Sequence, residues 1–272
     1  MRDILGDLSD AKLVKTVIKA NWENYHYCLG RSPTVELSVG KYLTWLVTGM
    51  PDHFMNLVVC TELPTEGTDE LIKNTLSHFR SLNIQKLSWI ADEGVPAMEI
   101  KKSLETHGLT FKESFAVEMA ADLTTLQEHK SVLTNLEIVR VGNEKMLREW
   151  IHVASIGFGV PVEVEDVWFD FFYDAACSHP FQTYLALWNG IPVGTSQLFT
   201  SAGVAGIYNV TCIPEARGQG IGTAITLAPL LEARKLGYCV GILQASSMGY
   251  KVYQRLGFQD YGKLSVYLWE QG

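Results

Sequence analysis

The sequence predicts an α+β fold built on a mixed β-sheet, in a chain of 272 residues that is long enough for one large domain or two smaller ones. Three observations support this prediction. Strand patterns and helix patterns alternate along residues 135–272. An Asn189-Gly190 pair between two apolar runs marks a β-hairpin. Further on, an apolar strand runs into a glycine-rich turn that opens a helix.

The elements of the C-terminal half follow from their residue patterns. Residues 136–141 read as a short strand, and Asn143 caps an amphipathic helix that stops near Gly157 and Gly159. The remaining expected elements are a helix over 163–173, hairpin strands over 183–188 and 193–200, a strand over 207–213, a helix from 221 that Pro229 kinks and Gly237 ends, a strand over 239–243, a helix over 249–256 and a strand over 264–269.

The glycine-rich turn has the character of a phosphate-binding loop. Gly218, Gly220 and Gly222 leave the backbone without β-carbons, so successive N–H groups can converge on an anion at the positive end of the following helix. A dinucleotide fingerprint needs GxGxxG, and the third glycine is absent. A nucleoside-triphosphate loop needs Gly-Lys-Ser/Thr, and lysine is absent. The spacing that remains is RxxGxG, beginning at Arg217.

This spacing resembles the pyrophosphate-binding motif of the GCN5-related N-acetyltransferases (GNAT), and the order of elements along residues 135–272 resembles their fold. The resemblance implies acetyl-CoA as the cofactor, with coenzyme A held by the loop. The cofactor-binding residues that it implies are Val210, Thr211, Cys212, Arg217, Gly218, Gln219, Gly220, Ile221, Gly222 and Thr223. Arg217 either shapes the turn or contacts phosphate. A glycine-rich strand-to-helix turn without a ligand is the open alternative.

The N-terminal half resembles a degenerate copy of the same unit. Its segment 63–68 aligns with the glycine loop but keeps one glycine, and Leu104 aligns with Tyr253. A polar stretch over 122–135 separates the copies. We therefore expect two tandem GNAT-like domains, a degenerate one over residues 1–128 and a catalytic one over residues 129–272, with one cofactor site in the chain.

Tyr253 is the expected catalytic residue. It lies ahead of Gly257-Phe258, where the family often places a phenol beside the thioester sulfur as a general acid. A tyrosine pKa of about 10 is close enough to a thiol's of about 8.5 for the proton to move. A tyrosine in the core is the alternative. In the family, the strand that ends at Cys212 splays from the next one, and its amides polarise the acetyl carbonyl. Cys212 itself is either a buried small residue or an acyl acceptor.

The acceptor side of the expected site is less defined by the sequence. In the family, the segment between the first two helices lines the acceptor pocket, which makes Glu163 and Glu165 candidates for the general base. Carboxylates in the first turn of a helix also interact favourably with its dipole, so a purely structural role for both residues stays open. Tyr208 and Asn209 are candidates for orienting the acceptor. The aromatic residues of the second helix are either a pocket wall or core: Trp168, Phe169, Phe171, Phe172 and Tyr173.

Composition excludes several other classes of function. A net charge of -8 with 22 scattered basic residues argues against nucleic acid. The five cysteines form no CxxC pair, and the seven histidines show no metal-ligand spacing, so no metal site is expected. The N-terminus lacks a signal-peptide pattern, and no apolar run reaches the roughly 20 residues that span a bilayer. We expect a cytoplasmic protein with no membrane partner.

Together these features predict an acetyl-CoA dependent N-acetyltransferase that acts on the amine of a small molecule or peptide by direct attack in a ternary complex. The alternative is a non-catalytic protein that binds or senses acyl-CoA, which would have no need of an acid beside the sulfur. The sequence leaves open the acceptor, the general base, the length of the acyl group, the oligomeric state, a homodimer included, and the physiological role.

Overall fold

The computed structural model describes residues 4–50, 53, 55–60, 62–64, 66–91, 97–128, 133–176 and 180–271. The chain forms two compact units: Met1–Leu29 with Glu118–Tyr261, and Gly30–Val117 with Gly262–Gly272. Each contains parallel and antiparallel strand pairs together with helices, which confirms the predicted α+β fold with a mixed sheet. None of the helices in the described ranges has both the length and the apolar character needed to cross a bilayer.

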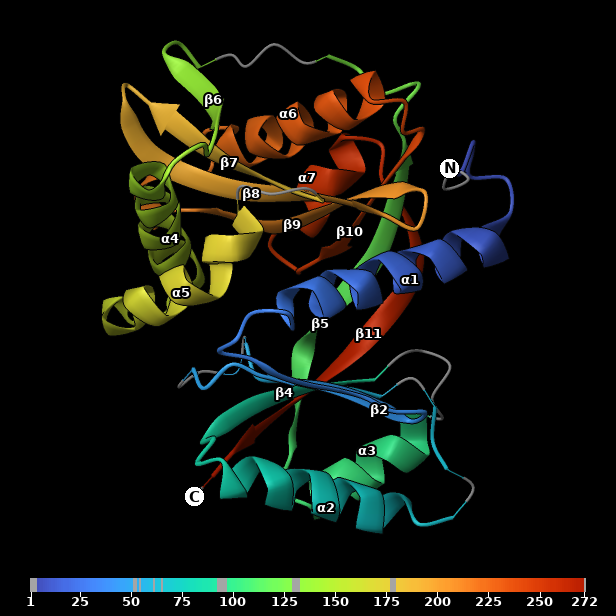
Figure 1. Cartoon of the computed structure of the whole chain (residues 1–272). Coiled ribbons are helices and arrows are strands. Elements are labelled where there is room, and N and C mark those ends of the chain that lie inside the picture. Colours follow the sequence, from blue (N-terminus) through green and yellow to red (C-terminus); the bar gives the residue numbers. More distant parts are fainter. Residues whose placement is uncertain are drawn as a thin grey trace. The chain divides into compact units, whose positions relative to one another are not determined.

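The first unit has the strand order β5-β10-β9-β8-β7-β6 (Figure 1). The strands are β5 (Thr110–Asp122, which enters this unit at Glu118), β6 (Leu136–Arg140), β7 (Phe181–Trp188), β8 (Ile191–Ser201), β9 (Val204–Cys212) and β10 (Val240–Ala245). The helices are α1 (Ala11–Leu29), α4 (Glu144–Phe158), α5 (Glu165–Ala176), α6 (Ile221–Lys235) and α7 (Tyr250–Arg255). The predicted order of elements from β6 to α7 is confirmed.

Local sequence signals account for several of these boundaries. The Asn143 side chain accepts a hydrogen bond from the Met146 N–H and so begins α4, as expected of an N-cap. Gly159, with φ of 73°, ends the same helix in the left-handed conformation. Between β7 and β8, Asn189 and Gly190 have φ values of 52° and 77°, the pattern of a tight hairpin turn whose twist matches the flanking strands.

Helix α1 lies in the range assigned to the degenerate domain, yet it belongs to the first unit. It packs against β8 and β9. Val14 and Ile18, one helical turn apart, pack in a buried cluster with side chains of three strands. These are Ala120 of β5, Val204 of β9, and Val240 and Ile242 of β10. Helix α1 therefore covers a sheet face of a unit whose other elements begin at Glu118, 89 residues after the helix ends.

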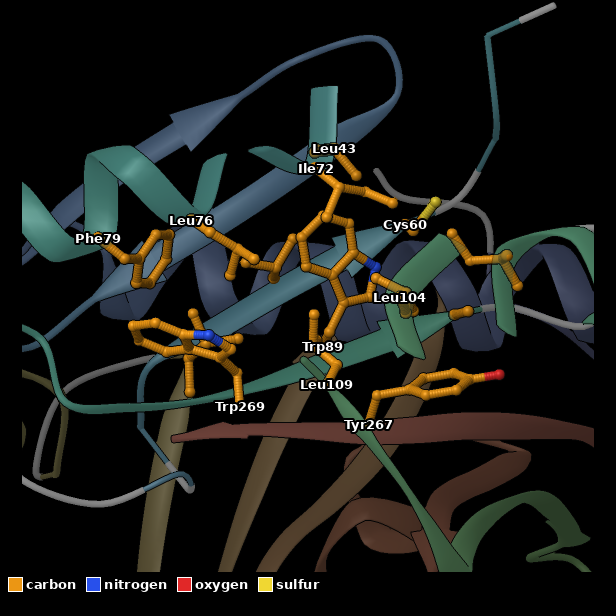
Figure 2. Packing of buried hydrophobic residues seen from close by; sticks show 14 of the residues in the cluster. Leu43, Cys60, Ile72, Leu76, Phe79, Trp89, Leu104, Leu109, Tyr267 and Trp269 are labelled. Carbon is orange, nitrogen blue, oxygen red and sulfur yellow. The ribbon is translucent and has the colours of Figure 1, made fainter. Parts of the chain in front are cut away.

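The second unit has the strand order β1-β2-β3-β4-β11-β5. Its elements are β1 (Glu36–Val39), β2 (Leu43–Val47), β3 (Leu57–Cys60), α2 (Thr68–Ser81), β4 (Lys86–Ala91), α3 (Ala97–Thr106), the first part of β5 and the last part of β11 (Gln259–Glu270). Figure 2 shows its core, in which Trp89 of β4 and Trp269 of β11 lie among aliphatic side chains from α2 and α3. The final strand β11 pairs with β4 from Ser265↔Ala91 to Glu270↔Lys86.

The two units divide the chain differently from the predicted ranges 1–128 and 129–272, because α1 and the end of β11 each group with the opposite half. The predicted boundary falls at residues 129–132, which lie outside the described residues, as does Thr65 of the segment aligned with the glycine loop. The order β1-β2-β3-α2-β4-α3-β5 nevertheless repeats β7-β8-β9-α6-β10-α7-β11. Descent of the two halves from one repeated unit stays a prediction.

Candidate active site

The glycine loop lies between β9 and α6 and presents an open helix N-terminus. Gly218 and Gly220 have φ values of 76° and 85°, a left-handed conformation that favours glycine. A Cβ at Gly218, Gly220 or Gly222 would meet nothing within 4 Å, so the space above the loop is free. The first helical hydrogen bond runs from the Ala224 N–H to the Gly220 carbonyl. The three preceding N–H groups therefore have no acceptor within the helix and suit an anion.

Arg217 shapes this turn. Its Nε donates to the Cys212 carbonyl at 3.2 Å, and one terminal nitrogen donates to the Gly157 carbonyl at 2.9 Å. The guanidinium thus joins the end of β9 to the end of α4. A Cβ at Gly157 would also collide with the Thr211 side chain, so α4 approaches β9 closely at this point. Of the two roles expected for Arg217, the structure shows the one in the turn.

The last part of β9 has one free edge. Strands β9 and β10 run parallel, and their pairing consists of Gly241↔Ala205 and Ile242↔Gly206. Tyr208, Thr211 and Cys212 of β9 remain paired with β8 on the other side. On β10, two residues beyond the last pair, Nε2 of Gln244 is buried and has no hydrogen-bond partner. The splayed strands expected from the resemblance are present, and they leave main-chain groups of β9 available to a ligand.

Tyr253 of α7 lies close enough to Cys212, the last residue of β9, for the thiol to affect the pKa of its hydroxyl. Its ring fills the space that a Cβ at Gly249 would need, 2.7 Å from the ring carbon Cε2, and the side chain is 8% exposed. Burial, and to a smaller extent Cys212, raises the pKa of Tyr253 above its ordinary value. The hydroxyl is therefore protonated at neutral pH. Among the described residues it has no hydrogen-bond partner.

Cys212 is poorly suited to be an acyl acceptor. Burial raises the pKa of its thiol to about 11, although Arg217 acts in the opposite direction. The nucleophilic form of cysteine is the thiolate, so little of it exists at neutral pH.

The other residues expected to contact the cofactor lie on β9, in the loop and at the start of α6. Val210 and Thr211 are half-buried on β9, Gln219 is exposed in the loop, and Ile221 and Thr223 lie in the first turn of α6.

Of the two acceptor-side carboxylates, Glu165 has a defined environment. Its Oε1 accepts a hydrogen bond from Ser155 Oγ at 2.5 Å and lies 3.0 Å from Nδ1 of His152. Ser155 is fully buried, whereas the His152 side chain is 56% exposed. The contacts of Glu165 with these two residues therefore extend from the interior to the surface. Glu163 is exposed on the short 3-10 helix Val162–Val164. His152 was not predicted, since the sequence separates it from Glu165 by 13 residues.

Tyr208 and Asn209 both use their side chains in contacts with α1. Tyr208 donates its hydroxyl proton to Oδ1 of Asn21 at 2.7 Å. Nδ2 of Asn209 donates to the Tyr25 hydroxyl at 2.9 Å and to Oε1 of Gln197 at 3.2 Å. These α1 residues were also missed by the sequence analysis. The available signal was an amphipathic pattern in which Val14, Ile18, Asn21, Tyr25 and Leu29 are buried on one face, but that pattern does not say against which sheet the face packs.

The aromatic residues of α5 are mainly core. Trp168, Phe171 and Phe172 are at most 2% exposed, whereas Tyr173 is 52% exposed. Arg148 of α4 covers the Phe169 ring at 3.9 Å and pairs with Asp166 at 3.2 Å. Within the described part of the chain, no three His, Cys, Asp or Glu side chains are grouped so that they could hold a metal ion.

Comparison with known proteins identifies the fold and the domain. Residues 179–260 match the model of the acetyltransferase (GNAT) domain family. The fold that includes residues 179–260 is that of a GNAT acetyltransferase domain. The resemblance read from the RxxGxG spacing is thereby confirmed, and the matched segment includes the glycine loop, both edges of the splay and Tyr253. No match was found among curated proteins.

Solved structures share the fold over nearly the whole chain. A GCN5-related N-acetyltransferase from Kribbella flavida has a TM-score of 0.70 and 16% identity, with 94% of this chain and 96% of that one covered. One from Sphaerobacter thermophilus has a TM-score of 0.64 and 14% identity, with 96% and 91% covered. A tandem GNAT protein from the clavulanic acid biosynthesis pathway has a TM-score of 0.61 and 14% identity, with 99% and 98% covered. The predicted tandem GNAT-like fold is confirmed.

Proposed function

We propose that this protein is an N-acetyltransferase that transfers an acetyl group from acetyl-CoA to the amine of a small molecule or peptide, by direct attack in a ternary complex. One observation carries the proposal. The open N-terminus of α6, the free edge of β9 and the unbonded hydroxyl of Tyr253 follow one another along a single path within the GNAT domain. We further propose a cytoplasmic location and a small-molecule partner, as the sequence analysis expects.

The residues present fit coenzyme A. The loop offers free N–H groups, and its three glycines put no Cβ in the way of a pyrophosphate. The free edge of β9 offers main-chain groups to the pantetheine amides. Nε2 of Gln244 supports this assignment, because an unsatisfied buried donor costs about 1–3 kcal/mol and a bound ligand would relieve that cost. When bound, the thioester supplies the activated acetyl group.

The protein's own residues then manage protons and orientation. Main-chain N–H groups on the free edge of β9 would polarise the acetyl carbonyl. The Tyr253 hydroxyl would donate a hydrogen bond, and then its proton, toward the leaving sulfur. Since burial raises its pKa, the hydroxyl acts as a donor throughout the neutral range. Glu165 would accept the proton of the incoming ammonium group, whose pKa is about 10, directly or through His152.

A non-catalytic acyl-CoA sensor is the competing function, and the unbonded Tyr253 hydroxyl favours the enzyme. Release of free thiol from acetyl-CoA, measured against a panel of amino acids, polyamines, aminoglycosides and peptides, tests the proposal. We expect amine-dependent thiol release for at least one class of acceptor, with the acetylated amine identified by mass spectrometry. Tight binding of acetyl-CoA without amine-dependent release for any class would favour the sensor.

A further inference from the structure

We propose that Tyr25 of α1 is a positioning residue for acyl transfer: with Gln197 it anchors Asn209 in the left-handed backbone conformation that bends β9 beyond its last pair with β10. The proposal rests on the proposed function, because this bend affects catalysis only if the acyl group lies along β9. The residues involved lie within one compact unit, and those of α1 lie outside the matched GNAT segment.

The backbone of β9 is irregular at Asn209. Its φ is 52°, in the left-handed region that few residues other than glycine adopt, although asparagine tolerates it better than most. Thr195 pairs with Thr211 and Gln197 pairs with Tyr208, so Asn209 and Val210 together oppose the single residue between them on β8. This is a β-bulge, which bends the strand and takes one residue out of the regular ladder.

Hydrogen bonds hold the bulge from both sides. Thr195 Oγ1 donates to the main-chain carbonyl of Asn209 at 2.8 Å, and the side-chain nitrogen Nδ2 of Asn209 donates to Tyr25 and Gln197. The Tyr25 hydroxyl in turn donates to Oε1 of Gln197 at 3.1 Å, and Nε2 of Gln197 donates to Thr183 Oγ1 at 3.1 Å. Gln197 and Thr183 are fully buried and Tyr25 is 5% exposed, so the loss of one hydrogen-bond partner would leave a buried polar group unsatisfied.

The position of Tyr25 is itself closely determined. Its ring stacks on that of Tyr208, with centroids 3.9 Å apart and planes 11° apart. Asn21, one turn earlier on α1, accepts from Tyr208 and donates through Nδ2 to the Ser201 carbonyl at 3.0 Å. A Cβ at Gly206 would collide with Asn21 and with the Tyr208 ring, so α1 approaches the sheet where only glycine leaves room. Helix α1 therefore presents the Tyr25 hydroxyl to the bulge at a fixed place.

Tyr25→Phe tests the anchor, because it removes the hydroxyl and keeps the ring. The matched control is Tyr184→Phe on β7, a tyrosine of similar burial whose hydroxyl donates to Gln182 Oε1 at 2.8 Å, away from the bulge. We expect Tyr25→Phe to lower kcat about tenfold with KM for acetyl-CoA changed less than about twofold, because the pyrophosphate loop is untouched. Tyr184→Phe should leave both constants near those of the wild type. Equal constants for the two variants would overturn the proposal.

Two substitutions at Asn209 separate backbone positioning from simple packing. Glycine adopts the left-handed conformation without an anchor, whereas alanine resists it, so Asn209→Gly should keep more activity than Asn209→Ala. In the Asn209→Gly background, Tyr25→Phe should have no further effect on kcat, because no side chain remains to be anchored. If Asn209→Ala is as active as Asn209→Gly, or if the two effects add, the proposal is wrong.

A measurement without substrate distinguishes this proposal from the proposed function. The three-bond HN–Hα coupling of Asn209 in the NMR spectrum reports its φ in the protein alone. We expect Tyr25→Phe to change that coupling and Tyr184→Phe to leave it unaltered. If the wild type transfers no acetyl group, the proposed function fails while the coupling still tests the anchor. If the coupling is the same in all three proteins, the anchor fails whatever the activity.

Discussion

Replacement of Gly220 by aspartate tests whether the glycine loop binds the pyrophosphate of coenzyme A. A Cβ at this position meets no atom within 4 Å, so the side chain fits sterically. The backbone φ of 85° is left-handed, and asparagine and aspartate are the residues that adopt such angles most readily after glycine. Gly220→Asn is therefore a matched control: it has the same shape and the same backbone strain, and it lacks the charge.

The expected magnitude follows from Coulomb's law. A carboxylate at the N-cap of α6 would lie about 5 Å from a diphosphate held by the first free N–H groups, and each pair of unit charges at that distance repels by about 0.8 kcal/mol in water and about 3 kcal/mol at the effective dielectric of a protein surface. Gly220 is exposed, so screening favours the lower part of this range. With two phosphate charges we expect a loss of about 2–3 kcal/mol, or roughly 30- to 150-fold in Kd.

Calorimetry with coenzyme A is the appropriate assay, at low and at high salt. We expect Gly220→Asn to bind within about tenfold of the wild type and Gly220→Asp to bind far more weakly, with the difference between the two variants shrinking as salt rises. Circular dichroism should show that both variants keep the fold. If Gly220→Asp binds coenzyme A as well as Gly220→Asn does, no phosphate lies at the N-terminus of α6 and the assignment of the loop is wrong.

Four further predictions concern other parts of the chain. Tyr253→Phe should keep cofactor affinity and lower kcat by about 10²-fold. Because burial raises the pKa of Tyr253, its hydroxyl should stay protonated up to about pH 10, and deprotonation of Tyr253 should not lower the wild-type rate below that pH. Glu165→Gln should lower the rate at pH 7, and the rate should recover as the pH approaches the amine pKa of about 10. An effect that does not depend on pH would instead assign Glu165 a structural role. Asp170→Asn, which replaces an exposed carboxylate of α5, is the control and should show no pH-dependent effect. Titration should give one coenzyme A per chain, because β3 and β4 pair up to their last residues and leave no free edge; a value of two would contradict this. A chain starting at Thr134 should aggregate or lose activity, because it lacks α1; a soluble and fully active fragment would contradict this prediction.

Local patterns in the sequence were sufficient for much of the C-terminal half. The Asn189-Gly190 turn, the Asn143 cap and the glycines of the loop each act through backbone geometry within a few residues, so their consequences can be predicted without knowing the rest of the fold. The same holds for the order of elements from the loop to the helix that carries Tyr253. These are the features that the structure reproduces.

Long-range pairings could not be predicted in the same way. The bond from Asn209 to Tyr25 joins residues 184 positions apart, and the ladder between β11 and β4 joins the end of the chain to its first half. An amphipathic pattern predicts that one face of α1 is buried, but it does not say which part of the sheet receives that face. The His152–Glu165 pair depends in turn on how α4 and α5 pack, which neither helix determines alone.

The contribution of α1 changes what should be regarded as the working unit of this protein. The GNAT segment contains the loop, the free edge and Tyr253, but the bulge that bends this edge is bonded to Tyr25. A repeat-based view would assign Tyr25 to the degenerate half and treat it as dispensable for catalysis. The Tyr25 hydroxyl is buried, and its partner Asn209 has an unfavourable backbone angle. Loss of the hydroxyl would therefore destabilise the bend in β9, the strand that would carry the acyl group. If Tyr25 anchors Asn209 as proposed, these N-terminal residues belong to the site, although their sequence carries no catalytic motif.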